Sequence, residues 1–261
     1  MKPKKHTFAI CAYKESPHLE TCIQSVVKQN AYSNIIMCTS TPSDFLSNLA
    51  NAYDIPLFIR EGKSDIQDDW NFCCEKAQTE WVTVTHQDDI YDENYAKELL
   101  LEISKEPNAI MAFTDYLPIK NGRIGTDLNS RMKRLFRTPM RFKVLRHNKF
   151  FKKYFQGFGN AISCPSVAYN KSLINGKVFT SPLKFALDWD TFVKFAGYNE
   201  PFIYIHKKLF YYRIHEEATS KSFTENNIRV NDEMYMFRQF WPNWLIKIGF
   251  KLYQRSYKTY D

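Results

Sequence analysis

The residues from position 81 to position 91 read Trp81-Val82-Thr83-Val84-Thr85-His86-Gln87-Asp88-Asp89-Ile90-Tyr91. The stretch predicts a buried strand that delivers two adjacent carboxylates, Asp88 and Asp89, at its exit. In open α/β sheets, ligands bind beyond the carboxyl ends of the strands, and Mg²⁺ or Mn²⁺ commonly joins a protein carboxylate to substrate phosphates. The pair therefore indicates either a metal and phosphate site or an acidic turn that caps the following helix.

Strands and helices alternate on both sides of this stretch. Short apolar runs are separated by amphipathic segments, which is the pattern of a parallel sheet with helices on its faces. Toward the N-terminus we expect strands at 7–12, 34–39 and 56–60 and helices at 17–29, 43–52 and 66–78. Toward the C-terminus we expect helices at 92–105 and 188–197 and strands at 109–114, 161–169 and 201–205. The predicted fold class is α/β, with a mostly parallel, Rossmann-like sheet flanked by helices.

The length and composition fit one large domain with a small appendage. A chain of 261 residues with 44% hydrophobic residues can bury a full core. We expect an α/β domain at 1–222 and a helical tail at 223–261, divided at Pro242. Because no run approaches the roughly 20 apolar residues of a transmembrane helix and no signal-peptide pattern precedes the first strand, we expect a cytoplasmic protein. The six cysteines lack CxxC spacing, which predicts buried free thiols.

The positive charge is concentrated in one segment. The net charge is +8, and residues 120–153 contain twelve Lys or Arg against one acid, Asp127. Cations alternate there with Leu, Val and Phe at three- and four-residue spacing, which predicts amphipathic helices split at Pro139. We interpret 120–155 as a basic helical insertion that either binds an anionic acceptor, docks peripherally on an anionic membrane, or packs as a solvated basic face. The aromatic tail could lie on a membrane, form a homodimer contact or pack on the domain, and we favour packing.

Several segments, in a fixed order, resemble a known family. Phe8 to Glu15 and Leu19 to Val26 are similar to the opening strand, nucleotide loop and first helix of family 2 inverting glycosyltransferases, which have the GT-A fold. Asp69-Trp70-Asn71 and His86-Gln87-Asp88-Asp89 resemble the asparagine of the third helix and the metal-binding Asp motif.

The later segments continue the resemblance. Gly159-Asn160 with Pro165-Ser166 resembles the turn before the acceptor-side strand of bacterial members, and Leu187-Asp188-Trp189-Asp190 stands where they carry their catalytic acids. Tyr211 to Ser220 resembles their closing Tyr-Arg-x-His stretch. The match covers residues 6–220 and points to the members that build bacterial cell-surface polysaccharide, such as lipopolysaccharide or capsule. The order and spacing of these motifs make the resemblance more specific than any single motif would.

The resemblance implies a metal-dependent enzyme that moves a sugar, with inversion, from a nucleoside-diphosphate donor to a glycan or lipid-linked acceptor. A UDP-sugar is the donor that it favours, and Mn²⁺ or Mg²⁺ is the cofactor. The metal ligands that it implies are Asp89, Asp88 and His215, and Asp188 is the base that takes the proton of the acceptor hydroxyl. Asp190 is the alternative base. The donor-binding residues that it implies are Ala12, Tyr13, Glu15, Thr39, Asn71, Gln87, Asp88 and Arg213.

Some of these residues have a second interpretation, and the chain departs from the family at three places. His215 could be a hydrogen-bonded core residue, and Arg213 could form a surface ion pair instead of binding phosphate. Lys14 stands where the family usually has Asn, residues 38–43 replace an acidic loop that often contacts the base, and Leu187 replaces the first acid of the catalytic pair. An Asp contact to uracil is therefore not carried over.

Two other functions compete with the glycosyltransferase interpretation. A nucleic-acid-binding protein would use the basic, aromatic-rich segment but would leave the acidic pair without a role, so we expect no nucleic acid as partner. A nucleotidyltransferase of related fold typically has a Gly-rich phosphate loop, whereas residues 12–15 contain no glycine.

Overall fold

The N-terminal part of the chain is a series of strand and helix units. The computed structural model describes residues 3–120, 122–126, 128–215, 223 and 227–253. The units are β1 (His6–Ala12), α1 (Leu19–Val27), β2 (Asn34–Thr39), α2 (Asp44–Ala52), β3 (Leu57–Ile59), α3 (Ile66–Lys76) and β4 (Trp81–His86). Side chains cap two of the helices: Ser43 accepts a hydrogen bond from the amide of Leu46, and Asp65 accepts from the amides that open α3. The elements predicted for this part of the chain are confirmed.

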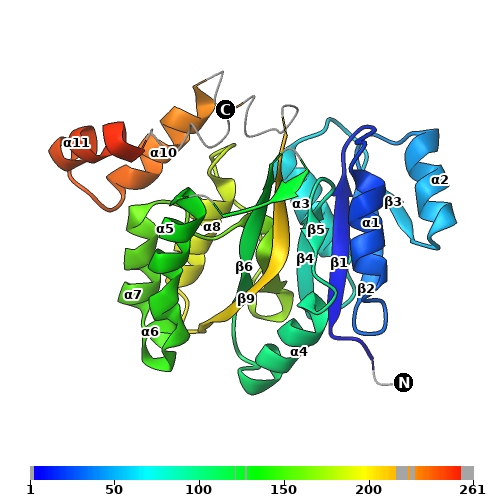
Figure 1. Cartoon of the computed structure of the whole chain (residues 1–261), viewed down its shortest axis with the longest axis horizontal. Helices are drawn as coiled ribbons and strands as arrows, with labels where there is room; N and C mark the ends of the chain where they lie inside the picture. Colours follow the sequence, from blue (N-terminus) through cyan, green and yellow to red (C-terminus); the bar gives the residue numbers. More distant parts are fainter. Residues whose placement is uncertain (1–2, 121, 127, 216–222, 224–226, 254–261) are drawn as a thin grey trace.

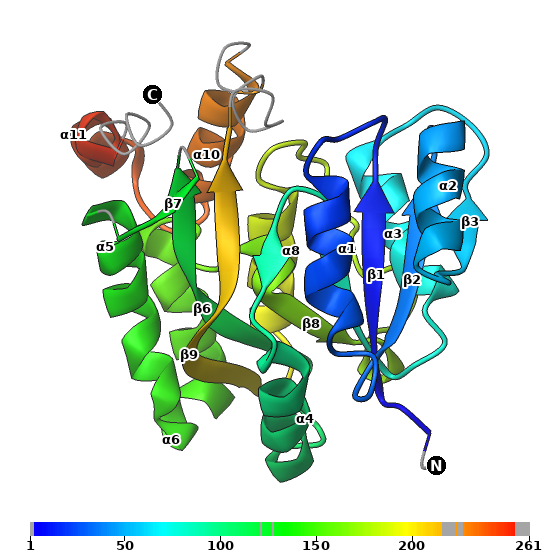
Figure 2. The ribbon, with the colours of Figure 1, turned by 45° about the vertical axis from the view of Figure 1, so that its right-hand side comes forward.

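The sheet is mixed, with parallel ladders accounting for most of the paired residues. Its later strands are β5 (Ile90–Tyr91), β6 (Met111–Lys120), β7 (Arg123–Ile124), β8 (Val167–Asn170) and β9 (Phe202–Ile214). The strand order is β3-β2-β1-β4-β8-β6-β9-β5, with β7 beside β6. The strands β1 to β4 are mutually parallel, as are β6 and β9, whereas β8 is antiparallel to both of its neighbours. Two helices lie between these later strands in the sequence, α4 (Tyr95–Lys105) before β6 and α8 (Leu187–Ala196) before β9. Figure 2 shows β1 and β9 ending at the same edge of the sheet.

Three strands differ from their predicted extents. The strand expected at 109–114 is the ten-residue β6, which continues to Lys120. Of the strand expected at 161–169, only β8 forms, because Pro165 has no amide to donate and lies in the 3-10 turn Cys164–Ser166. The strand expected at 201–205 is instead the thirteen-residue β9. Its apolar run is interrupted by His206, Lys207 and Lys208, which lie where the ladder with β6 shifts register. The irregular register places Lys207 and Lys208 toward solvent and His206 against Arg134, so the strand continues past its apolar run.

The basic insertion is helical, as predicted. It comprises α5 (Leu128–Arg137), the 3-10 turn Thr138–Arg141, α6 (Lys143–His147), α7 (Lys149–Tyr154) and the 3-10 turn Phe155–Phe158. The carboxylate of Asp115, fully buried on β6, ties α5 to the sheet. Arg137 donates to it from Nη2 at 2.8 Å, and Arg134 Nε lies 3.1 Å from its other oxygen. Figure 1 shows the insertion at the end of the molecule opposite α2 and β3.

The C-terminal helices pack against α8. These helices are α10 (Ile228–Arg238) and α11 (Asn243–Tyr253), and Pro242 lies between them as predicted. Met236, Phe237 and Ile246 form an apolar cluster with Trp189 and Val193 of α8. Two larger clusters fill the two faces of the sheet. Packing is thus the role that the described part of the tail has, while residues 254–261 lie outside the described part.

The six cysteines are free thiols, and all except the half-buried Cys11 are buried, as the sequence predicts. Burial raises the pKa of the Cys73 and Cys74 thiols, which keeps them protonated. Within the described residues, no helix combines the length and the apolar character needed to cross a bilayer.

Candidate active site

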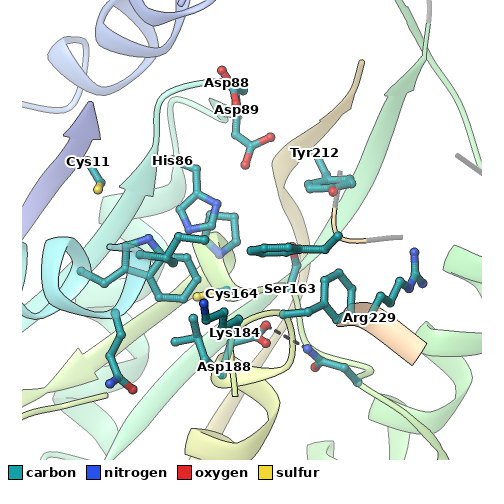
Figure 3. Close-up of a pocket in the computed structure, with 18 of the residues that line it drawn as sticks. Cys11, His86, Asp88, Asp89, Ser163, Cys164, Lys184, Asp188, Tyr212 and Arg229 are labelled. Carbon is teal, nitrogen blue, oxygen red and sulfur yellow. Dashed lines mark hydrogen bonds between the residues drawn. The ribbon is translucent and has the colours of Figure 1, made fainter. Parts of the chain in front are cut away.

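A cavity of about 740 Å³ opens at the carboxyl edge of the sheet. Its wall combines the exits of β1 and β4, the start of α3, the end of β9, and residues from α5, α8 and α10. Figure 3 shows Asp88 and Asp89 on one side of it and Asp188 on the other. The topology therefore brings together carboxylates that lie about a hundred positions apart in the sequence.

Asp89 is almost completely buried at the cavity edge, with 2% of its surface exposed. Its Oδ1 accepts a hydrogen bond from the amide of Arg213 at 2.9 Å. Burial raises the pKa of the Asp89 carboxyl well above its ordinary value, and the neighbouring charge of Asp88 raises it further. The carboxylate form therefore needs a nearby cation.

Asp88 is held by groups from two distant segments. Ser16 donates to its Oδ1 at 2.8 Å, and His215 Nε2 lies 3.3 Å from its Oδ2. The side chain of Arg213 donates from Nε to the carbonyl oxygen of Asp88 at 2.8 Å. The end of β9 thus places Arg213 and His215 beside the acidic pair, while residues 216–220 of the predicted Tyr-Arg-x-His stretch lie outside the described residues.

The residues present fit a divalent cation. Two adjacent carboxylates and an imidazole are donors that Mn²⁺ and Mg²⁺ accept. Burial and the charge of Asp88 raise the pKa of Asp89 although the charge of Arg213 lowers it, so a further cation at this edge would favour the carboxylate form. Among the described residues, His, Cys, Asp and Glu side chains do not gather in threes as a ready ion site. Phosphate or water oxygens would have to complete the coordination, as is usual for Mg²⁺.

Four of the predicted donor-binding residues line the cavity. They are Tyr13, Gln87, Asp88 and Arg213. The amide of Gln87 joins the exits of β1 and β4, because it accepts from the Tyr13 amide at 2.8 Å and donates to the Tyr13 carbonyl at 3.0 Å. Gln87 therefore fixes the backbone that presents the exposed ring of Tyr13.

The other four predicted donor-binding residues, Ala12, Glu15, Thr39 and Asn71, are not among the residues of the cavity wall. Thr39 is buried and accepts from the amide of Thr41 at 3.0 Å. The side-chain amide of Asn71 donates to the carbonyl oxygen of Phe179 at 2.8 Å and accepts from its backbone amide at 3.0 Å. Both residues support the loops around the cavity, and a direct ligand contact stays a prediction.

A second polar cluster, around Asp69, was not among the residues proposed from the sequence. Arg60 Nε donates to Asp69 Oδ1 at 2.7 Å, while Ser40 and Ser64 donate to Oδ2 at 3.0 and 2.9 Å. Asp69 lines the cavity beside Trp70, whose ring lies 4.9 Å from that of His86. Burial lowers the pKa of His86 to about 4, so its imidazole is neutral at neutral pH.

Asp188 lies in the first turn of α8 and faces the cavity from the opposite side. Asn160 Nδ2 donates to its Oδ2 at 2.8 Å, and the amide of Trp189 donates to its Oδ1 at 2.8 Å. Burial raises the pKa of the Asp188 carboxyl to about 6, although the Asn160 hydrogen bond opposes this shift. Asp190 is outside the cavity wall and pairs with Lys194 at 2.7 Å, so Asp188 is the one of these two carboxylates that lines the cavity.

The helix α10 also reaches the site, which the sequence did not indicate. Arg229 and Glu233, both buried, line the cavity as an ion pair at 3.1 Å. Asp232 Oδ2 accepts hydrogen bonds from the amides of residues 184, 185 and 186, at 2.9, 2.7 and 3.2 Å. It thereby holds the loop that leads directly into Asp188.

Solved structures with the same architecture include two nucleotide-sugar complexes. Residues 1–349 of TarS from S. aureus in complex with UDP-GlcNAc match with 16% identity and a TM-score of 0.57, over 84% of this chain and 61% of that one. The mannosyltransferase PcManGT from Pyrobaculum calidifontis in complex with GDP-Man and Mn²⁺ matches with 14% identity and a TM-score of 0.56, over 83% and 59%. The match thus spans about three fifths of the length of these two solved chains, and 39% of a longer TarS chain.

At these identities the structural matches establish the GT-A type of fold. No curated protein matches the chain in sequence. The family model described as "Glycosyl transferase family 2" matches residues 7–168, which hold β1 to β4 and the acidic pair, and the chain belongs to glycosyl transferase family 2.

Proposed function

We propose that the chain is a metal-dependent, inverting glycosyltransferase that moves a hexosyl group from a nucleoside-diphosphate sugar to a hydroxyl of a glycan or lipid-linked acceptor. The observation that carries the proposal is the placement of Asp88 and Asp89 across one cavity from Asp188. Inverting transfer needs this division, because the leaving diphosphate and the acceptor hydroxyl lie on opposite sides of the anomeric carbon.

On the donor side, this chain's residues would bind and orient the diphosphate. Asp89 and Asp88, with His215, would hold Mn²⁺ or Mg²⁺, which when bound neutralises charge on the leaving nucleoside diphosphate. The guanidinium of Arg213, already fixed on the Asp88 carbonyl, suits a phosphate oxygen beside them. The ring of Tyr13 offers a stacking surface for the base.

On the acceptor side, Asp188 would take the proton of the attacking hydroxyl. Its pKa of about 6 leaves it ionised at neutral pH and makes it a stronger base than an ordinary aspartate. The Asn160 hydrogen bond orients one carboxylate oxygen and leaves the carboxylate facing the cavity. Lys133 of α5 lines the same cavity, so a cation from the basic insertion lies on the side proposed for the acceptor.

A UDP-sugar is the donor that we propose. One of the two structural relatives is described with UDP-GlcNAc and the other with GDP-Man, so both bases belong in the test. The expected partners are this donor and the glycan or lipid-linked acceptor. A cytoplasmic location, a homodimer and a role in cell-surface polysaccharide synthesis remain predictions.

The test is a thermal-shift screen of UDP, GDP and CDP, each with and without Mn²⁺, followed by assay of nucleotide release from the matching sugars. We expect stabilisation only when nucleotide and metal are both present, by about 2.7 kcal/mol at a ligand concentration 100 times the Kd. Stabilisation by nucleotide without metal would contradict the metal-dependent mechanism. An absence of stabilisation by every pair would contradict the proposed activity.

A further inference from the structure

A row of aromatic rings, exposed in its central part and half-buried at Phe136 and Trp241, joins the basic insertion to the C-terminal tail. We call this row, formed by Phe136, Phe150, Tyr154, Phe158 and Trp241, the aromatic ridge. The ring centroids of Phe150 and Tyr154 lie 5.6 Å apart, and those of Tyr154 and Phe158 lie 5.3 Å apart. Phe158 in turn contacts Phe136 at 5.4 Å and Trp241 at 5.6 Å. The ridge is therefore a continuous surface built from three separate segments.

Phe136 and Trp241 also pack against the core, but core packing does not account for Phe150 or for the other exposed apolar side chains of the insertion. Phe150 is 76% exposed, although the same short helix uses Phe151 to pack on the core. Further exposed apolar residues in the insertion and at the start of α11 are Met132, Leu135, Phe142, Val144 and Trp244. Apolar side chains gathered on one surface usually mark a site of interaction, whereas scattered ones need no explanation.

The surface around the ridge is strongly cationic. Five exposed cations of the insertion accompany its apolar residues: Arg131, Arg141, Lys143, Lys149 and Lys153. The only acid among residues 120–153 is Asp127. The nearby carboxylate of Glu106 is already engaged by Arg146 and His147, each at 3.2 Å. An exposed apolar surface surrounded by cations is complementary to a layer that is anionic outside and apolar beneath.

We propose that the aromatic ridge and its surrounding cations form a docking surface for an anionic lipid bilayer. Rings and aliphatic side chains would enter the boundary between headgroups and acyl chains, while the lysines and arginines remain at the headgroup phosphates. Figure 1 shows the three short helices of the insertion side by side at one end of the molecule, where they can meet a flat surface together.

The charge of the surface favours a bilayer over a second copy of the chain. Two copies facing each other through this surface would bring like charges together, which destabilises such a contact. The arrangement of the side chains also favours a bilayer over nucleic acid. Phe150 and Tyr154 stack on each other with 14° between their planes, which occupies ring faces that bases would need, and Val144 and Leu135 offer bases no stacking surface.

Docking would have a consequence for the cavity. The helix α5 contributes Ser130 and Lys133 to the cavity wall, while Met132 and Leu135 on the same helix are exposed. A bilayer in contact with this helix would lie next to the side of the cavity that we assign to the acceptor. The docking itself does not depend on the proposed function, since it requires no nucleotide, metal or turnover.

The test is co-sedimentation of the purified chain with vesicles of phosphatidylcholine alone or mixed with phosphatidylglycerol. We expect binding to the anionic vesicles only, and weaker binding as salt is raised. Each cation near an anionic surface strengthens binding about fivefold, so Lys149→Gln with Lys153→Gln should weaken it roughly 25-fold. Phe150→Ser with Val144→Ser should also reduce binding while leaving all charges in place.

The matched controls lie elsewhere on the molecule. Lys28→Gln with Lys97→Gln removes two exposed cations, and Ile59→Ser removes an exposed apolar side chain at the other end of the sheet. These controls should affect vesicle binding only slightly, and every variant should bind nucleotide with Mn²⁺ as the unmodified chain does. Equal loss in controls and ridge variants, preference for an RNA oligonucleotide, or a dimer abolished by Phe150→Ser would overturn the proposal. Failure of nucleotide binding in all variants would count against the proposed function alone.

Discussion

Two adjacent carboxylates at a buried edge repel each other unless a cation or a proton lies between them. Asp89 is in this situation, because burial raises its pKa and the charge of Asp88 adds to the shift. We predict that Asp89→Asn abolishes the Mn²⁺-dependent nucleotide stabilisation, a loss of about 2.7 kcal/mol at a ligand concentration 100 times the Kd. Thermal shift measures this, with Asp68→Asn on the exposed side of α3 as the control. Retention of the Mn²⁺ effect in Asp89→Asn would remove Asp89 from the metal site.

The pKa of Asp188 predicts how kcat/KM falls on the acidic side of its pH profile. A base must be unprotonated, so kcat/KM should fall as pH drops through the Asp188 pKa of about 6. The hydrogen bond from Asn160 lowers this pKa, and Asn160→Ala should therefore move the acidic limb to higher pH. Asp188→Asn should lose turnover while keeping Mn²⁺-dependent nucleotide binding. An unmoved limb in Asn160→Ala would show that another group sets the profile.

At the scale of elements, the basic insertion depends on one buried anion. Asp115 is fully buried and faces Arg137, whose side chain is also buried. Asp115→Asn would leave the guanidinium with weakened compensation, and we predict a loss of about 3 kcal/mol in the free energy of unfolding. Urea denaturation measures it. Asp115→Asn with Arg137→Met should cost less than Asp115→Asn alone, because the buried charge is then removed along with its partner.

The contact between α10 and the loop before α8 connects the C-terminal tail to Asp188, the proposed base. Asp232 accepts hydrogen bonds from the backbone amides of residues 184–186, and Asp188 follows two positions later in the first turn of α8. We predict that Asp232→Ala lowers kcat at least about tenfold, because a loosened loop misplaces the base, while the KM for the donor changes little. Asp232→Asn keeps one acceptor oxygen and should recover part of the rate. An equal rise in donor KM would indicate general damage to the cavity.

At the scale of the whole molecule, the sequence predicted best what depends on neighbouring residues. The order of the elements follows from the apolar pattern of the sequence, and the structure confirms it. The acidic pair after β4 is visible because its two residues are adjacent in the sequence, and the structure places it at a cavity. The predicted length of β9 was too short, because an irregularity in its ladder with β6 accommodates three polar residues within the strand. The hydrogen bonds of Ser40 to Asp69 and of Phe185 to Asp232 were missed because their partners lie 29 and 47 positions apart and meet only in the folded chain.

The tail provides the test of how the molecule is divided. If the α/β domain ended at residue 222, a chain truncated there would keep its stability. The structure leads to the opposite expectation, since Met236, Phe237 and Ile246 cover Trp189 and Val193 of α8. Burial of three such side chains contributes roughly 5 kcal/mol, so truncation should lower the Tm by about 10–20 °C. Calorimetry measures the Tm. An unchanged Tm would instead show that residues 1–222 fold as an independent domain and that α10 lines the cavity without stabilising it.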